Sequence, residues 1–234
     1  MSVSVRFLDT ISSADSDDGV WPNFRRQFSE TDFGDGSLRG FWLQYPHEFK
    51  SVNGDANNTG VEAGAIGRLN DEKWNPPGAG LYKLNTDAAL LAENCSVGVG
   101  VVIRNEGGLV MAATTQRIEA TYVLEVAEAV AMLRGITLAV YIGLVPVIIE
   151  SDHHNLVRKV VDMDPTDVDI GLVVNDILFY ILNRTASLVS YVSRKANKVA
   201  HSLAKMALAI TEDRFWLEEV PPSMELIVLE DVPD

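Results

Sequence analysis

The sequence predicts a domain of the α/β class, in which a mixed sheet is covered by helices. Two β-rich runs, 97–104 and 109–115, flank a turn that contains glycine, as in a β-hairpin. Further along, a helical pattern over 122–141 is followed by a fully apolar run, 146–150, and by a second helical pattern, 154–161. Strand, helix, strand and helix in this order predict a parallel crossover connection.

Length and composition are those of a protein with a substantial core. Of the 234 residues, 47% are hydrophobic, which is enough to bury a sizeable interior. No apolar run approaches the roughly 20 residues that cross a bilayer, so we expect no membrane partner. Cys95 is the only cysteine, which excludes an intramolecular disulfide and favours a reducing compartment. Residues 1–18 lack a basic-then-apolar signal pattern, so we expect an intracellular protein, nuclear or cytoplasmic, that is not secreted.

Charge and composition divide the chain into three parts. The formal net charge is -14, and most of the excess acid lies at the two ends. Residues 1–73 are rich in Ser, Asp, Gly and Asn and lack a sustained hydrophobic period, so we predict a mostly disordered N-terminal arm. Residues 74–210 carry the strand and helix patterns and are the predicted domain. Residues 211–234 hold eight acidic residues and one basic residue and are the predicted acidic C-terminal tail.

The first predicted strand, 81–89, is a short alternating run whose carboxyl end carries a lone acid, Asp87. Prolines and glycines precede the run, so the chain enters the strand from a turn. In the hairpin that follows, Gly98 and Gly100 interrupt a series of β-branched residues. Glycine weakens a strand on propensity, so this pair predicts close approach of another backbone or tight packing beneath a helix.

The last part of the domain is predicted to contain a helix over 169–182, a strand over 187–192 and a final helix over 195–210. The final helix is amphipathic, with apolar residues on its inner face and lysines on its outer face. No acid occurs between Asp176 and Glu212, so the basic residues there form a local patch. From charge alone, a nucleic-acid contact and a solvated helix face are about equally supported.

Three acids, Asp87, Glu128 and Asp152, are candidate metal ligands. Asp87 and Asp152 end neighbouring parallel strands, and Glu128 interrupts the apolar crossover helix that covers both. Three carboxylates at one sheet edge suit hard cations such as Mg²⁺ or Mn²⁺. Two such ions about 4 Å apart activate a water and stabilise the leaving oxygen in phosphodiester hydrolysis.

Each of these acids also has a purely structural interpretation. Asp87 is suited to a turn, and Asp152 is suited to the N-cap of the helix that follows it. Glu128 is suited to a solvent-facing position or to an ion pair with Arg134. The four histidines form no zinc-type cluster, and no nucleophile-elbow motif is present.

Six motifs occur in order along the chain: WNPP at 74–77, KLNTDAA at 83–89, GVGVVIRN at 98–105, AEA at 127–129, VIIESD at 147–152 and RKANKVAHSLAK at 194–205. Together they resemble the ribonuclease H type 1 family, and specifically the reverse-transcriptase-like ribonuclease H domains that plant genomes carry in large numbers. The resemblance covers about residues 74–210. It implies a ribonuclease H-like α/β fold with a five-stranded mixed sheet, in the order 3-2-1-4-5, flanked by helices.

The resemblance also implies a function. The expected activity is metal-dependent endonucleolytic hydrolysis of the RNA strand of RNA–DNA hybrids, with Mg²⁺ or Mn²⁺ at a two-metal site. The alternative is a catalytically degenerate module that binds nucleic acid or protein without cleavage.

The resemblance assigns roles to individual residues. Asp87, Glu128 and Asp152 would be catalytic metal ligands. His201 stands where the family has a fourth acid, and we include it in the catalytic set. Three carboxylates offer a charge of about -3 against the +4 of two divalent ions, so the second ion is expected to bind weakly. The predicted contacts to the nucleic-acid backbone come from Arg194, Lys195, Lys198 and Lys205.

Overall fold

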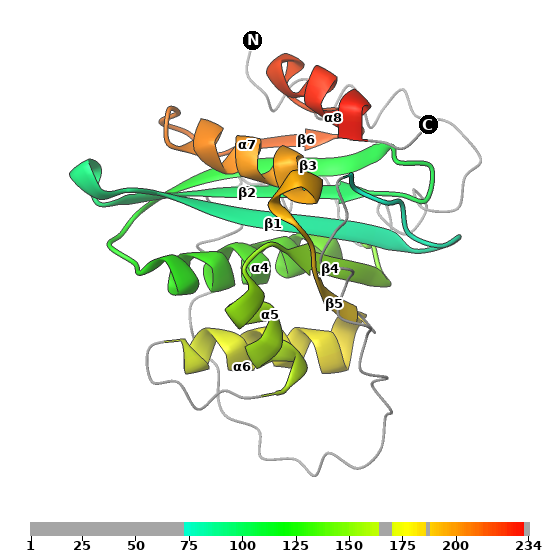
Figure 1. The fold of residues 1–234 in the computed structure, drawn as a ribbon, viewed down its shortest axis with the longest axis horizontal. Helices are drawn as coiled ribbons and strands as arrows, with labels where there is room; N and C mark the ends of the chain where they lie inside the picture. Colours follow the sequence, from blue (N-terminus) through cyan, green and yellow to red (C-terminus); the bar gives the residue numbers. More distant parts are fainter. Residues whose placement is uncertain (1–72, 164–169, 186–187, 232–234) are drawn as a thin grey trace, which may run out of the picture. The chain divides into compact units, whose positions relative to one another are not determined.

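The structure is a computed structural model and describes residues 73–163, 170–185 and 188–231. The N-terminal arm that the sequence predicts to be disordered lies outside the described residues up to residue 72. Helices below keep the numbering of Figure 1, in which the first labelled helix is α4.

A six-stranded mixed sheet forms the centre of the described part of the chain. Its order is β5-β4-β1-β2-β3-β6, where β4 runs parallel to β1 and β5, and the other neighbours are antiparallel. The strands are β1 (Tyr82–Leu91), β2 (Ser96–Arg104), β3 (Val110–Glu119), β4 (Val147–Ser151), β5 (Leu188–Tyr191) and β6 (Arg214–Leu217). The predicted order 3-2-1-4-5 is therefore confirmed, with one strand added beside β3.

The sixth strand corrects the prediction of five. β6 pairs antiparallel with β3 from Ala112↔Leu217 to Thr115↔Arg214, and the Thr114 hydroxyl donates to the Arg214 carbonyl at 2.8 Å. This strand comes from the segment that is predicted to be an acidic tail. Its contribution is not visible in composition, because the strand is only four residues long and is stabilised by the free edge of β3.

Five α-helices in the described part of the chain lie on the two sides of the sheet. As Figure 1 shows, α7 and α8 lie on one side, and α4, α5 and α6 lie on the other. They are α4 (Leu124–Tyr141), α5 (His154–Val161), α6 (Gly171–Tyr180), α7 (Lys198–Ala207) and α8 (Glu225–Asp231). The predicted final helix begins as a 3-10 turn, Arg194–Asn197, before α7 starts. The Ser193 hydroxyl caps this turn by accepting from the Ala196 N–H. No described helix combines the length and apolarity needed to cross a membrane.

Glycines bring both helix layers close to the sheet. A β-carbon at Gly98 would collide with the Ala204 carbonyl of α7, and one at Gly100 would collide with the Ala200 carbonyl. The predicted packing of this glycine pair beneath a helix is thus confirmed. On the opposite face, a β-carbon at Gly135 of α4 would lie 2.9 Å from the side chain of Leu84. The two β2 glycines therefore let the α7 backbone lie directly over β2, and Gly135 lets α4 approach β1 on the other face.

A set of five buried polar residues, Lys83, Asn85, Arg104, Glu150 and Asp231, forms what we call the charge-balanced network. Arg104 donates to Asp231 Oδ2 at 2.9 Å and to Asn85 Oδ1 at 3.2 Å. Asn85 in turn donates to Glu150 Oε2 at 2.9 Å, and Lys83 Nζ lies 2.7 Å from Glu150 Oε1. Two cations and two anions therefore neutralise each other inside the protein, as buried charges require.

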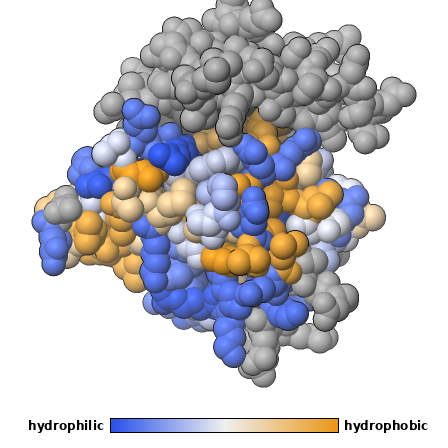
Figure 2. Space-filling model, turned by 90° about the horizontal axis from the view of Figure 1, so that it is seen from above, coloured by the Kyte–Doolittle hydropathy of each residue, from blue (hydrophilic) through white to orange (hydrophobic). Residues whose placement is uncertain are grey.

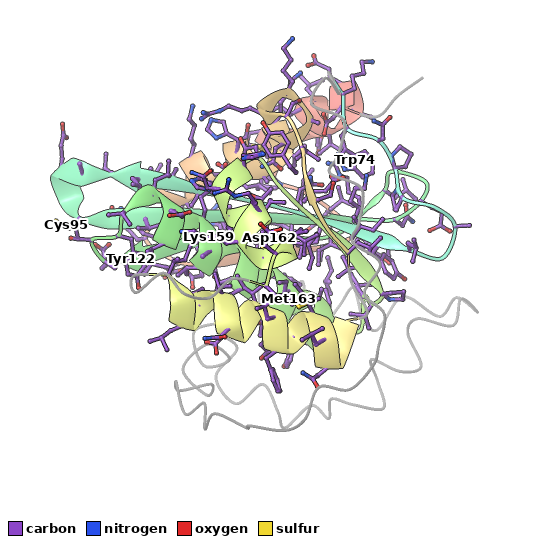
Figure 3. The ribbon with its side chains drawn as sticks, turned by 60° about the horizontal axis from the view of Figure 1, so that its bottom comes forward. Trp74, Cys95, Tyr122, Lys159, Asp162 and Met163 are labelled. Atoms are coloured by element: carbon purple, nitrogen blue, oxygen red, sulfur yellow. The ribbon has the colours of Figure 1, made fainter. Side chains whose placement is uncertain are left out.

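The network joins the two ends of the described chain. Asp231 belongs to α8, so the C-terminal helix is fixed to β2 through Arg104. The buried ring of Trp74 lies 3.5 Å from the Arg104 guanidinium, which is a cation–π contact. Figure 3 shows Trp74 at one end of the sheet and Cys95, at the β1–β2 turn, at the other.

The helix α8 covers the core with one side only. Met224, just before α8, joins the buried cluster of Val102 and Leu203, while Leu226 and Leu229 are exposed. Figure 2 shows the face seen from above, where hydrophobic areas lie among hydrophilic ones. The part of the predicted acidic tail between residues 214 and 231 thus contributes a strand, a helix and core side chains.

Candidate metal centre

Two of the candidate ligands lie where the central strands separate. The parallel ladder between β1 and β4 ends at the pair Thr86↔Ser151. Asp87 and Asp152 are the next residues along the chain after this pair. Asp152 follows β4, but the prediction that Asp87 ends the first strand is wrong, because β1 continues to Leu91 and Asp87 pairs with Gly100 of β2. The site therefore lies where the parallel pairing ends and the two chains diverge.

Glu128 reaches the same place from α4, which packs on the face of the sheet opposite to α7. Asp87, Glu128 and Asp152, which we call the acid cluster, each offer an oxygen within 4.8 Å of the others. Asp87 and Glu128 are buried, and Asp152 is partly exposed. Because the ladder has ended, side chains from both layers can meet in the gap between the strands.

The structure does not support the structural interpretations of these acids. Asp87 lies within β1 and not in a turn. The N-cap of α5 is His153, whose Nδ1 accepts from the Leu156 N–H at 3.2 Å, so Asp152 is left for the cluster. Glu128 is only 5% exposed and therefore does not face solvent. The charge of Asp213, and not of Glu128, is the main one that acts on Arg134.

Burial and crowding of like charges favour the protonated acids. Burial, followed by the charge of Asp152, raises the pKa of Asp87 to about 8. Burial, followed by the charges of Asp87 and Asp152, raises the pKa of Glu128 to about 9. A backbone hydrogen bond from Ala88 and the charge of Arg194 oppose the rise at Glu128. Without a cation, the cluster therefore retains protons near neutral pH.

His201 on α7 contacts the acid cluster through Asp87, with Nδ1 2.9 Å from Asp87 Oδ2. Its pKa is lowered by partial burial and by the charges of Arg194 and Lys205. Arg194 Nη2 lies 3.3 Å and 3.5 Å from the two ring nitrogens. The imidazole is therefore neutral near pH 7. A neutral ring has one N–H and one acceptor nitrogen, so Nδ1 can accept from the protonated Asp87 carboxyl or donate to its ionised form.

The predicted backbone-binding residues lie on the 3-10 turn and on α7. The side chains of Arg194, Lys195, Lys198 and Lys205 are exposed. Arg194 and Lys205 lower the pKa of Asp87, so they act on the cluster electrostatically. The structure thus places positive charge at the edge of the acid cluster.

The acid cluster fits a divalent cation. Glu128 Oε2 is buried and has no hydrogen-bond partner among the described residues, which is rare for a charged group. Ion pairs within the described part of the chain join none of the three acids to a lysine or arginine; only His201 makes such a contact. Oxygen-only ligands of this kind suit Mg²⁺ or Mn²⁺.

Sequence reasoning missed one residue of the site, Asn197. Its side chain is fully buried and donates to the Thr86 carbonyl and to Asp152 Oδ1, each at 3.0 Å. The signal was present, because Asn197 lies within the motif at 194–205 and interrupts the inner face of an otherwise apolar helix pattern.

Comparison with known families gives the relationship. The model of the reverse transcriptase-like family matches residues 85–207, which is more than half of the chain and spans the acid cluster and His201. The chain belongs to this family. No curated protein matches the sequence.

The chain is similar in fold to solved ribonuclease H structures, and the similarity to LC11-RNase H1 shows that this reverse transcriptase-like chain has a ribonuclease H-type fold. LC11-RNase H1, solved in complex with an RNA/DNA hybrid, is 22% identical, with a TM-score of 0.50 over 55% of this chain and 96% of its own. RNase H1 from the archaeon Halobacterium salinarum is 20% identical, with a TM-score of 0.49 over 56% of this chain and 98% of its own. The N-terminal RNase H domain of a Mycobacterium tuberculosis protein is 20% identical, with a TM-score of 0.48 over 55% and 93%.

Proposed function

We propose that this chain is a metal-dependent endonuclease that hydrolyses the RNA strand of RNA–DNA hybrids without base specificity. The observation that carries the proposal is the acid cluster: three carboxylates within 4.8 Å, with Glu128 Oε2 buried and unpartnered among the described residues. The family and the fold are those of ribonuclease H-type domains, and LC11-RNase H1 with its bound hybrid supplies the substrate class.

Asp87, Glu128 and Asp152 would hold Mg²⁺ or Mn²⁺. The cation would activate a water and stabilise the leaving oxygen of the cleaved phosphodiester. The raised pKa values of Asp87 and Glu128 mean that these two acids release protons when a cation binds. The three carboxylates carry a charge of about -3, which is enough to neutralise one divalent ion but not the +4 of two. A second ion would therefore bind weakly.

His201 would act on the site through Asp87. Its contact at 2.9 Å orients the Asp87 carboxylate, and the neutral ring adds no negative charge where the family has an acid. Imidazole is a better ligand for Mn²⁺ than for Mg²⁺. We therefore assign to His201 a preference of the enzyme for Mn²⁺.

The substrate would be bound through its phosphates. The four basic residues Arg194, Lys195, Lys198 and Lys205 are exposed, and the charges of Arg194 and Lys205 act on Asp87. Lysine and arginine contacts of this type position the nucleic acid but do not read its sequence.

A second candidate function is nucleic-acid or protein binding without cleavage. The His201 contact supports it, because the imidazole already engages an oxygen of Asp87 that a cation needs. The protonation of Asp87 and Glu128 near neutral pH also favours this function, since protons on the two acids lower the apparent affinity for metal.

A cleavage assay separates the two functions. Purified protein is incubated with an end-labelled hybrid in Mg²⁺ or in Mn²⁺, and the variant Asp87→Asn is compared with Asp162→Asn, which changes an exposed acid after α5. Loss of groups that only support a metal ligand costs about 10- to 100-fold, so loss of the ligand itself should reduce cleavage by more than about 100-fold. Asp162→Asn should cleave at the wild-type rate.

The binding function makes a different prediction in the same assay. The wild-type protein would retain the hybrid in a gel-shift experiment but cut it in neither metal. That result would overturn the endonuclease proposal.

A further inference from the structure

Asn197 lies at the junction of three elements. It ends the 3-10 turn, immediately precedes α7, and inserts its side chain between β1 and the residue that follows β4. Its Nδ2 lies 3.0 Å from the Thr86 carbonyl oxygen and 3.0 Å from Asp152 Oδ1. One amide group therefore uses its two N–H donors on two different segments of the sheet.

The position of this bridge is informative. Thr86 and Ser151 form the last pair of the β1–β4 ladder, and each directly precedes an acid of the cluster. Beyond this pair no backbone hydrogen bond of the ladder fixes the separation of the two strands. The Asn197 amide spans the gap at that point, so it fixes the Asp152 carboxylate relative to the backbone that carries Asp87.

The amide is chemically suited to this task. Both of its neighbours are acceptors, so only the orientation with Nδ2 toward them forms hydrogen bonds, while Oδ1 is buried without a partner among the described residues. A lysine at the same place would neutralise Asp152, as Lys83 neutralises Glu150 in the charge-balanced network. A neutral donor orients the carboxylate and leaves its full negative charge for a cation.

We propose that Asn197 is a positioning residue that holds Asp152 in the acid cluster and thereby sets the affinity of the cluster for divalent cations. The inference rests on the proposed function, because it requires the cluster to bind metal. It assigns to Asn197 an effect that is transmitted through Asp152 and not through the stability of the fold.

A double-mutant cycle on metal binding tests this role. The Mn²⁺ dissociation constant of the full chain, without nucleic acid, is measured by electron paramagnetic resonance for the wild type, Asn197→Leu, Asp152→Asn and the double variant. Leucine branches at the same carbon as asparagine and has no donor. Asn197→Leu should weaken Mn²⁺ binding by about 10- to 100-fold, the range for groups that orient metal ligands. In the Asp152→Asn background, Asn197→Leu should change the Mn²⁺ dissociation constant by less than about twofold.

Two controls keep the test decisive. Asn175→Leu makes the same substitution on the exposed side of α6 and should leave Mn²⁺ binding unchanged. Asn197→Ser keeps one donor, and it carries the test if circular dichroism shows that Asn197→Leu does not fold. The serine variant should then weaken Mn²⁺ binding when Asp152 is present and have no effect in the Asp152→Asn background.

The outcomes separate this inference from the proposed function. Wild-type affinity in a folded Asn197→Leu protein, or an equal loss in both backgrounds, would overturn the positioning role alone. If the wild-type chain binds no Mn²⁺, the metal-dependent function fails, and the role of Asn197 fails with it.

Discussion

Two groups of buried polar side chains meet on β1, and they differ in charge balance. Lys83, Asn85 and Asp87 alternate along the strand, so they share the face that α7 covers. Lys83 and Asn85 belong to the charge-balanced network, in which two cations neutralise two anions. Asp87, two residues further along, belongs to the acid cluster, in which three carboxylates meet without a lysine or arginine pair among the described residues.

The balance of charge within each group distinguishes a structural cluster from a ligand site. Burial raises the pKa of Glu150, but the charge and hydrogen bond of Lys83 oppose the rise. Burial also raises the pKa of Glu128, and there the neighbouring acids Asp87 and Asp152 add to it. The first cluster is complete within the protein, whereas the second needs either protons or an added cation.

The largest expected effect on stability comes from breaking the charge-balanced network. Asp231→Ala leaves the fully buried Arg104 without its counter-ion. Removing one partner of a buried ion pair typically costs about 3–5 kcal/mol, so urea denaturation should show a loss of this size. At least an equal loss is expected for a chain that lacks α8.

Matched variants define the cause of that loss. Asp162→Ala removes an exposed acid and should change the free energy of unfolding by less than about 0.5 kcal/mol. Arg104→Met combined with Asp231→Leu removes both charges and should recover most of the stability. If Asp231→Ala is as stable as Asp162→Ala, the C-terminal helix is not held by the buried ion pair.

A smaller effect is expected at the edge of the acid cluster. His201→Asp supplies a fourth carboxylate, which should raise Mg²⁺-dependent cleavage and reduce the preference for Mn²⁺. The wild-type activity should fall at acid pH, because protonation of His201 places a positive charge beside Asp87. Since the pKa of His201 is lowered, this fall should come at a lower pH than that of an ordinary imidazole. The acid limb of the pH profile should move in the variant.

Ser202→Asp is the control for this change, since it adds an acid to the next position of α7. An unchanged metal preference and pH profile in His201→Asp would mean that His201 is only a residue of the helix surface.

The sequence predicted the elements whose patterns are local. Five strands, their order and the glycine pair beneath α7 follow from runs of β-branched residues, turn residues and the family resemblance. The convergence of Asp87, Glu128 and Asp152 follows from the parallel crossover, which places the end of β4 and one helix beside β1, although Asp87 itself lies within β1 and not at its end.

Features that depend on distant partners were not predictable from local patterns. The strand β6 has four residues and exists through the free edge of β3. Arg104 appears in sequence as an ordinary strand end, and its counter-ion Asp231 lies 127 residues away in a segment described only as acidic. Asn197 stands out in the sequence as a polar residue within an apolar helix pattern, but its role does not, since its partners lie on β1 and directly after β4. The division of the chain at residue 73 stays a prediction.

The unbalanced acid cluster has a consequence for stability against pH. In the unfolded chain Asp87 and Glu128 ionise near pH 4, whereas their pKa values in the fold are raised to about 8 and about 9. Between these limits the folded state binds more protons, so the stability without metal falls as pH rises from about 4 to about 9. A cation that replaces the protons should reverse the loss.

Thermal melting at pH 8, in a chelator and in Mn²⁺, therefore tests the central claim most directly. At an Mn²⁺ concentration of about 100 times the dissociation constant, the wild-type melting temperature should rise by roughly 5–10 °C. Asp87→Asn should melt higher than the wild type in chelator, because it removes a repelling charge, and should lose the response to Mn²⁺. A wild-type protein that melts at the same temperature with and without Mn²⁺ would contradict the account.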